Sequence, residues 1–108
     1  MSNERKSDAV IKKKQKKTGQ EPVERIFVIG NKLGLHARPA AVFVQTANRF
    51  EASIEVQKED LKVDGKSIMG IMTLAAEKGS SITVRATGKD AAPAMDALIK
   101  LIESNFGE

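Results

Sequence analysis

Residues 24–50 have the sequence ERIFVIGNKLGLHARPAAVFVQTANRF, and the spacing of their apolar side chains changes within this stretch. Over Arg25–Ile29 the side chains alternate between two faces, which is typical of a β-strand. Over Ala37–Phe50 apolar residues recur every three or four positions and form one stripe, which predicts an amphipathic helix. Two glycines in residues 30–34 indicate a loop between them. The stretch therefore predicts a strand, a loop and a helix.

The rest of the chain continues this alternation. The predicted elements after residue 50 are strands at Ser53–Lys58, Leu61–Val63 and Ser81–Thr87, and helices at Ser67–Ala76 and from Ala91 onward. Ser67 and Asp90 are candidate N-caps, and Gly79 lies where the shorter helix is expected to stop. The order β-α-β-β-α-β-α predicts an α+β fold of the open-faced β-sandwich type. In it, a four-stranded antiparallel sheet is covered on one face by three helices.

The same patterns predict which side chains form the core. They are Ala40, Phe43, Val44, Ala47, Phe50, Ile54, Val56, Ile82, Val84, Ala86, Ala91, Ala94, Met95, Leu98, Leu101 and Ile102. In the short helix, helical spacing cannot place every apolar residue on one buried face, so we expect Ile71 and Leu74 to be buried.

Composition excludes several classes of site. The chain has no cysteine and one histidine, which excludes disulfides, thiolate chemistry and multi-histidine metal sites, and we expect no metal. No apolar stretch is long enough to span a membrane, and no signal peptide is seen, so we expect a cytoplasmic protein without membrane insertion.

The net charge of +4 is unevenly distributed. Residues 1–23 contain seven basic and three acidic side chains, whereas residues 24–108 contain equal numbers of each. We therefore expect residues 1–23 to be a disordered basic extension and residues 24–108 to be the folded domain. The lysine-rich run at residues 12–17 leaves open an alternative function as a nucleic-acid-binding module, although the neutral body argues against a nucleic-acid partner.

The lone histidine, His36, lies at the expected start of a helix. The first N–H groups of a helix have no internal partner and carry partial positive charge, so they favour a bound anion. Because Pro39 has no N–H, the expected backbone donors are Ala37 and Arg38. The Arg38 guanidinium can bond two phosphoryl oxygens at once. The segment therefore predicts a nucleophilic imidazole beside a phosphate-binding site.

Two segments resemble the HPr family, the histidine-containing phosphocarriers of the bacterial phosphoenolpyruvate-dependent phosphotransferase system. Residues 34–40, GLHARPA, resemble the family's active-site segment, and residues 66–72, KSIMGIM, resemble its regulatory serine motif. The resemblance implies that His36 accepts a phosphoryl group on Nδ1 from enzyme I and passes it to an enzyme IIA. Arg38 would stabilise the transferred charge. It implies a carrier and not an enzyme, with no cofactor.

The resemblance also implies a regulatory site and a partner surface. Ser67 would be phosphorylated by an HPr kinase/phosphorylase. The partner-binding residues carried over are Ala41, Gln45, Ile68, Met69 and Met72. We expect a monomer. The sequence leaves open whether the carrier serves sugar transport or the regulatory nitrogen-type branch, and which enzyme IIA it meets.

Overall fold

The computed structural model describes residues 21–108, so most of the expected disordered extension lies outside the described residues. The strands are β2 (Val23–Val28), β3 (Ser53–Lys58), β4 (Leu61–Asp64) and β5 (Ser81–Thr87). The helices are α2 (Ala37–Ala47), α3 (Ile68–Thr73) and α4 (Ala91–Glu103), followed by a 3₁₀ turn, η2 (Asn105–Gly107). The first strand thus begins at Val23, the last residue of the expected extension.

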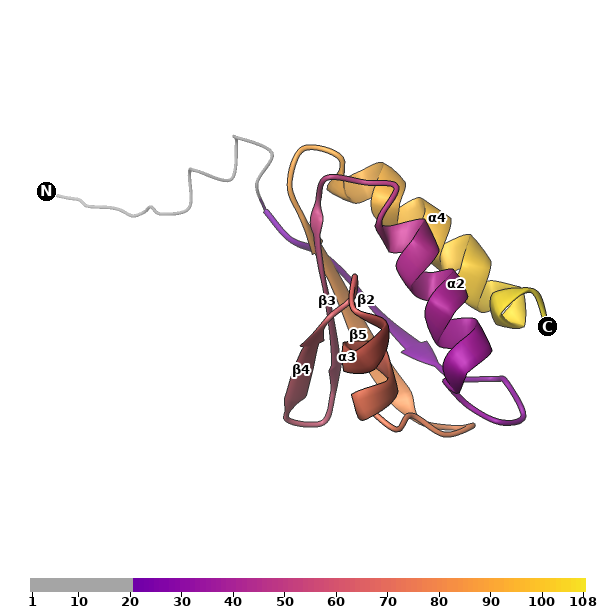
Figure 1. Ribbon diagram of the computed structural model, residues 1–108. Coiled ribbons are helices and arrows are strands. Elements are labelled where there is room, and N and C mark those ends of the chain that lie inside the picture. Colours follow the sequence, from indigo (N-terminus) through magenta and orange to yellow (C-terminus); the bar gives the residue numbers. More distant parts are fainter. Residues whose placement is uncertain (1–20) are drawn as a thin grey trace, which may run out of the picture.

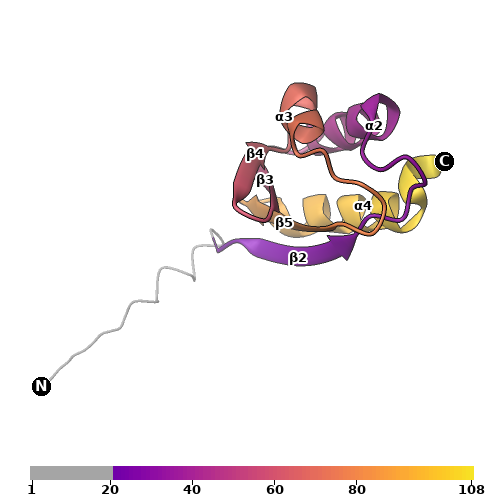
Figure 2. The same cartoon turned by 90° about the horizontal axis from the view of Figure 1, so that it is seen from below.

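The four strands form one antiparallel sheet in the order β2-β5-β3-β4. The three helices lie on one face of this sheet, with α2 beside α4 and the short α3 beside α2 (Figures 1 and 2). The architecture is therefore the predicted open-faced β-sandwich. It places the start of α2 and the end of the chain at the same end of the molecule (Figure 1).

The core lies between the sheet and the helices. The inward side chains of β3 and β5 and the stripes of α2 and α4 are buried as predicted, except that Phe50 and Leu101 are only partly buried. The opposite face of the sheet is open, and Ile26 and Val28 are exposed there. On that face Arg85 pairs with Glu24 and Glu55, and hydrogen bonding to Glu24 raises the pKa of Arg85.

Two helix ends differ from the prediction. Helix α2 ends at Ala47, and residues 48–50 continue as turns. Helix α3 ends at Thr73, so the prediction of a helix to Ala76 with a stop at Gly79 was wrong. Leu74 and Ala76 are both buried, but residues two positions apart lie on nearly opposite faces of a helix, so a helix packed on one side would expose one of them. The backbone leaves the helix through Ala75, whose φ of 51° lies in the left-handed region.

Asp90 occupies the N-cap position of α4 but does not cap that helix with its side chain. Its carboxylate instead accepts hydrogen bonds from the N–H groups of Glu51, at 2.9 Å, and Ala52, at 2.8 Å. Both hydrogen bonds lower the pKa of Asp90, and the bond from Glu51 has the larger effect. The predicted cap therefore ties the start of α4 to the segment before β3.

Candidate functional site

His36 is the N-cap residue of α2, as predicted. Its backbone is extended, with φ −79° and ψ −169°, and its carbonyl accepts the first hydrogen bond of the helix from Ala40 at 3.0 Å. The side chain makes no capping hydrogen bond and is 36% exposed. The imidazole is therefore held at a helix start while remaining accessible to another molecule.

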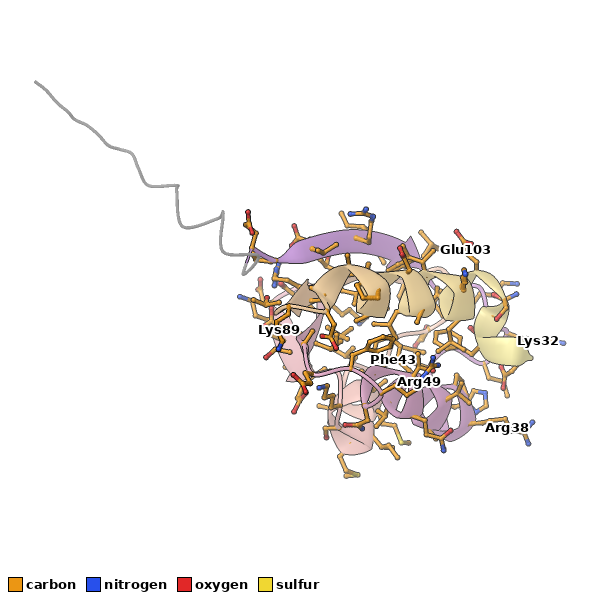
Figure 3. The ribbon with its side chains drawn as sticks, turned by 90° about the horizontal axis from the view of Figure 1, so that it is seen from above. Lys32, Arg38, Phe43, Arg49, Lys89 and Glu103 are labelled. Atoms are coloured by element: carbon orange, nitrogen blue, oxygen red, sulfur yellow. The ribbon has the colours of Figure 1, made fainter. Side chains whose placement is uncertain are left out.

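The backbone donors beside His36 are free to bind an anion. Within residues 21–108, no hydrogen bond uses the N–H of Ala37 or Arg38, and Pro39 has none to offer. The Arg38 side chain projects away from the body of the protein at this end of α2 (Figure 3). A phosphoryl group on His36 would thus meet two N–H groups, a helix dipole and a guanidinium.

The loop before His36 is pinned to the segment after α3. The N–H of Leu35 donates to the carbonyl of Ala76 at 2.8 Å, and the Leu35 side chain is buried. Gly34 adopts a positive φ of 69°, and a Cβ there would lie 2.3 Å from the same carbonyl oxygen. Only glycine permits this close approach. The contact fixes where the chain enters α2, and so where His36 lies.

An open pocket of about 520 Å³ surrounds the imidazole. It is lined by Lys32, Leu33, His36, Ala37, Arg38 and Glu108. Lys32 and Arg38 both project at this end of the molecule (Figure 3). The pocket therefore joins the predicted histidine, both predicted backbone donors and the predicted arginine.

Glu108 is a site residue that the sequence did not reveal. Its Oε2 lies 3.3 Å from Nε2 of His36, and its Oε1 accepts a hydrogen bond from Nδ2 of Asn31 at 2.7 Å. Asn31 is buried, in the loop that leads to His36. Glu108 is 72 residues from His36 and belongs to no periodic pattern, so local sequence gave no signal for this contact.

Ser67 is the N-cap of α3, and its side chain performs the predicted role. The Oγ accepts a hydrogen bond from the N–H of Gly70 at 3.0 Å. Ser67 is only partly exposed. A phosphate on this residue would lie at a helix N-terminus, which the helix dipole favours.

The predicted partner residues lie on two adjacent helices. On α3, Ile68, Met69 and Met72 are 42%, 74% and 40% exposed. Ile71 and Leu74 are buried, which confirms the predicted division between core and surface. On α2, which packs against α3, Gln45 is exposed and Ala41 is half-buried. These two helices thus present a mostly apolar surface, hereafter the α2–α3 surface, formed by Ala41, Gln45, Ile68, Met69 and Met72.

Two negative findings apply to residues 21–108. No group of three or more acidic or histidine side chains there could hold a metal ion. No helix in this part of the chain is long and apolar enough to cross a membrane.

Comparison with known proteins identifies the family. The family model described as the PTS HPr component phosphorylation site matches residues 23–104, and the chain belongs to this family of phosphotransferase-system phosphocarriers. It is 54% identical over 78 residues to phosphocarrier protein HPr of Neisseria meningitidis, covering 72% of this chain and 88% of that protein. It is 52% identical over 81 residues to the HPr-like protein Crh of Halalkalibacterium halodurans, covering 75% of this chain and 96% of that protein. The crystal structure of HPr-C-His from Thermoanaerobacter tengcongensis matches with a TM-score of 0.77 and 52% identity, covering 80% of this chain and 97% of that one.

Proposed function

We propose that His36 is the phosphoryl-accepting residue of this phosphocarrier and that it receives the group from phosphorylated enzyme I. The observation that carries the proposal is the geometry at the start of α2. An accessible imidazole lies at the N-cap, the N–H groups of Ala37 and Arg38 have no partner among the described residues, and the pocket includes Arg38. The matched family model, described as the PTS HPr component phosphorylation site, spans this segment and supports the proposal.

The chemistry is an in-line phosphoryl transfer. Nδ1 of His36 forms the new bond to phosphorus while the bond between phosphorus and its donor atom in enzyme I breaks, and that electron pair returns to the donor atom. The negative charge on the three phosphoryl oxygens is met by Arg38 and the helix N-terminus. The reverse sequence of bond changes delivers the group to an enzyme IIA. Positioning and charge stabilisation suffice, so the carrier needs no cofactor.

The α2–α3 surface is the proposed docking site for enzyme I and enzyme IIA. Exposed methionine adapts to differently shaped partners because its side chain is flexible and polarisable. Exposed Met69 and Met72 lie next to Ile68 on a helix that packs against the one carrying His36. A surface of this kind suits a carrier that must meet two proteins in turn.

Ser67 is the proposed regulatory site, phosphorylated by an HPr kinase/phosphorylase. Phosphorylation adds nearly two negative charges at neutral pH. Placed beside the α2–α3 surface, these charges would repel acidic groups of a partner. The fold would tolerate them, because Ser67 caps α3 and a helix N-terminus favours negative charge.

The cellular setting follows from the proposed partners. We propose a cytoplasmic, monomeric carrier in sugar uptake, in which the phosphocarrier domain begins with β2 at Val23, one residue before the predicted boundary, and residues 1–20 are dispensable for phosphoryl transfer.

The test is incubation with enzyme I and labelled phosphoenolpyruvate. The wild-type chain is expected to acquire an acid-labile label, as phosphohistidine does, and His36→Ala is expected to lose it. A chain lacking residues 1–20 should be labelled as well as the full chain. A wild-type chain that remains unlabelled by enzyme I from several bacteria would contradict the proposal.

A further inference from the structure

Asn31 is a buried polar residue whose side chain, among residues 21–108, forms hydrogen bonds only with the last segment of the chain. It is 3% exposed, and its Nδ2 donates to the carbonyl of Asn105 at 2.9 Å and to Oε1 of Glu108 at 2.7 Å. Both partner atoms are acceptors, so the amide nitrogen must face them. Its Oδ1 is then left without a hydrogen bond among the described residues.

The backbone between the two Asn31 partners is held in an uncommon conformation. Asn105, Phe106 and Gly107 have φ values of 55°, 60° and 79°, in the left-handed region that bulky residues avoid. The Phe106 side chain is 3% exposed and anchors this turn in the core. The turn reverses the chain after α4, and Asn31 binds it at both ends. Glu108 is thereby returned to the loop that carries His36.

The second carboxylate oxygen of Glu108 faces the imidazole. Oε2 lies 3.3 Å from Nε2 of His36, which favours a proton on that nitrogen. In a neutral imidazole, a proton on Nε2 leaves Nδ1 with a free lone pair. Within residues 21–108, no hydrogen bond occupies Nδ1.

We propose that Asn31 is a positioning residue that acts on His36 through Glu108. It holds the Glu108 carboxylate so that the neutral imidazole carries its proton on Nε2 and offers Nδ1 to phosphorus. This inference rests on the proposed function, since Nδ1 is the proposed phosphoryl acceptor. It assigns a role to two residues that flank the site and lie on separate segments of the chain.

The experiment records ¹⁵N spectra of the imidazole in the full, unphosphorylated chain at alkaline pH, so that the two neutral tautomers are compared. The wild-type ring is expected to be mainly protonated on Nε2. Glu108→Gln removes the charge that faces this nitrogen, and should shift the ratio of the two tautomers by about twofold or more. Asn31→Ala should do the same. Asn31→Leu, which is similar in shape and has no donor, is the second variant if alanine impairs folding.

Glu103→Gln is the matched control, because this exposed glutamate lies on α4, away from Arg38 and the start of α2 (Figure 3). It should leave the tautomer ratio unchanged. Combining Asn31→Ala with Glu108→Gln should give the same ratio as Glu108→Gln alone, because the first residue acts through the second. Phosphoryl transfer from enzyme I should slow by about two- to tenfold in each single variant.

An unchanged tautomer ratio in Glu108→Gln would overturn the inference. So would an Asn31 variant that lowers the melting temperature and leaves the ratio unaltered, because that result describes a purely structural role. The spectra require no enzyme I. A failure of the positioning role is therefore distinguishable from a failure of the proposed function, which would instead leave the wild-type chain without label.

Discussion

The carboxylate of Asp90 accepts a hydrogen bond from the backbone N–H of Ala52 at 2.8 Å, joining the start of α4 to the start of β3. A second bond, from Glu51, lowers the pKa of Asp90 further than the bond from Ala52 does. Since the ionised form makes these bonds, its contribution to stability is present above the pKa of an unfolded aspartate. It is lost as the pH falls through the lower, folded-state pKa.

Asp90→Ala is therefore expected to lower the melting temperature at neutral pH. The difference from the wild-type chain should shrink at a pH below the folded-state pKa of Asp90, because the wild-type carboxylate is then protonated. Thermal unfolding followed by circular dichroism across the acidic range measures this. Asp96→Ala is the control on the same helix, because the Asp96 side chain is exposed and makes no hydrogen bond within the described residues. A constant difference at every pH would contradict the prediction.

Arg38→Ala is expected to slow phosphoryl transfer from enzyme I by about a hundredfold, because a charged donor to the phosphoryl oxygens is lost. Arg38→Lys should restore only part of the rate, since an ammonium group cannot bond two oxygens in a planar fork. Both variants should fold normally, because Arg38 is exposed. Arg49→Ala is the matched control, because Arg49 lies just after the C-terminal end of α2, whereas Arg38 lies at its start (Figure 3). Equal rates of phosphoryl transfer for the Arg38→Ala and Arg49→Ala variants would show that Arg38 has no role in the transfer.

Ser67→Ala is expected to destabilise the protein by about 0.5–2 kcal/mol, because the N–H of Gly70 loses its capping partner. Ser67→Asp should retain most of this stability, since aspartate also caps helices. Chemical denaturation measures both values. Ser81→Ala, at an exposed position in β5, should change stability by less than about 0.5 kcal/mol. In a kinase reaction with ATP, an acid-stable label that persists in Ser67→Ala would exclude Ser67 as the regulatory site.

Gly34→Ala should destabilise the protein far more than Gly79→Ala. Both glycines have positive φ, so each substitution should cost about 1–2 kcal/mol of backbone strain. Only at Gly34 would the new Cβ also collide with the Ala76 carbonyl, whereas nothing lies within 4 Å at Gly79. The free energies of unfolding of the two variants are compared, and the additional loss in Gly34→Ala measures the cost of the collision. Equal losses would show that the loop before His36 can move away from the segment after α3.

Met69→Ser is expected to weaken binding to enzyme I by about 1–2 kcal/mol while changing stability by less than about 0.5 kcal/mol. Ile71→Ala, two residues further along α3, should instead destabilise the fold by about 2–5 kcal/mol, because Ile71 is 1% exposed. Calorimetric titration and denaturation provide the two measurements. Unchanged enzyme I affinity in Met69→Ser would place the docking site elsewhere.

Sequence patterns predicted the sheet, the three helices and the division between buried Ile71 and exposed Ile68, because periodicity reports which side of an element faces the core. They placed His36 at the start of a helix for the same reason. They could not place the end of α3, where tertiary burial of Leu74 and Ala76 overrides the helical period.

The sequence also could not reveal Asn31 and Glu108 as neighbours of the site. Their contact depends on a turn with three consecutive positive φ values, two of them at residues other than glycine. No local rule predicts such a conformation for Phe106, because it forms only when the folded core holds that side chain.

The position of His36 at the start of α2 has a consequence for the order of events in the proposed pathway. A protein–protein interface typically covers about 800 Å² on each partner, which is far larger than one imidazole. Enzyme I and enzyme IIA must each enclose the same histidine, so they compete for one area and cannot occupy it together. Each cycle therefore requires the donor to dissociate before the acceptor arrives. Dissociation is then a step of every cycle, so binding tight enough to make dissociation slower than phosphoryl transfer would lower the throughput of the carrier.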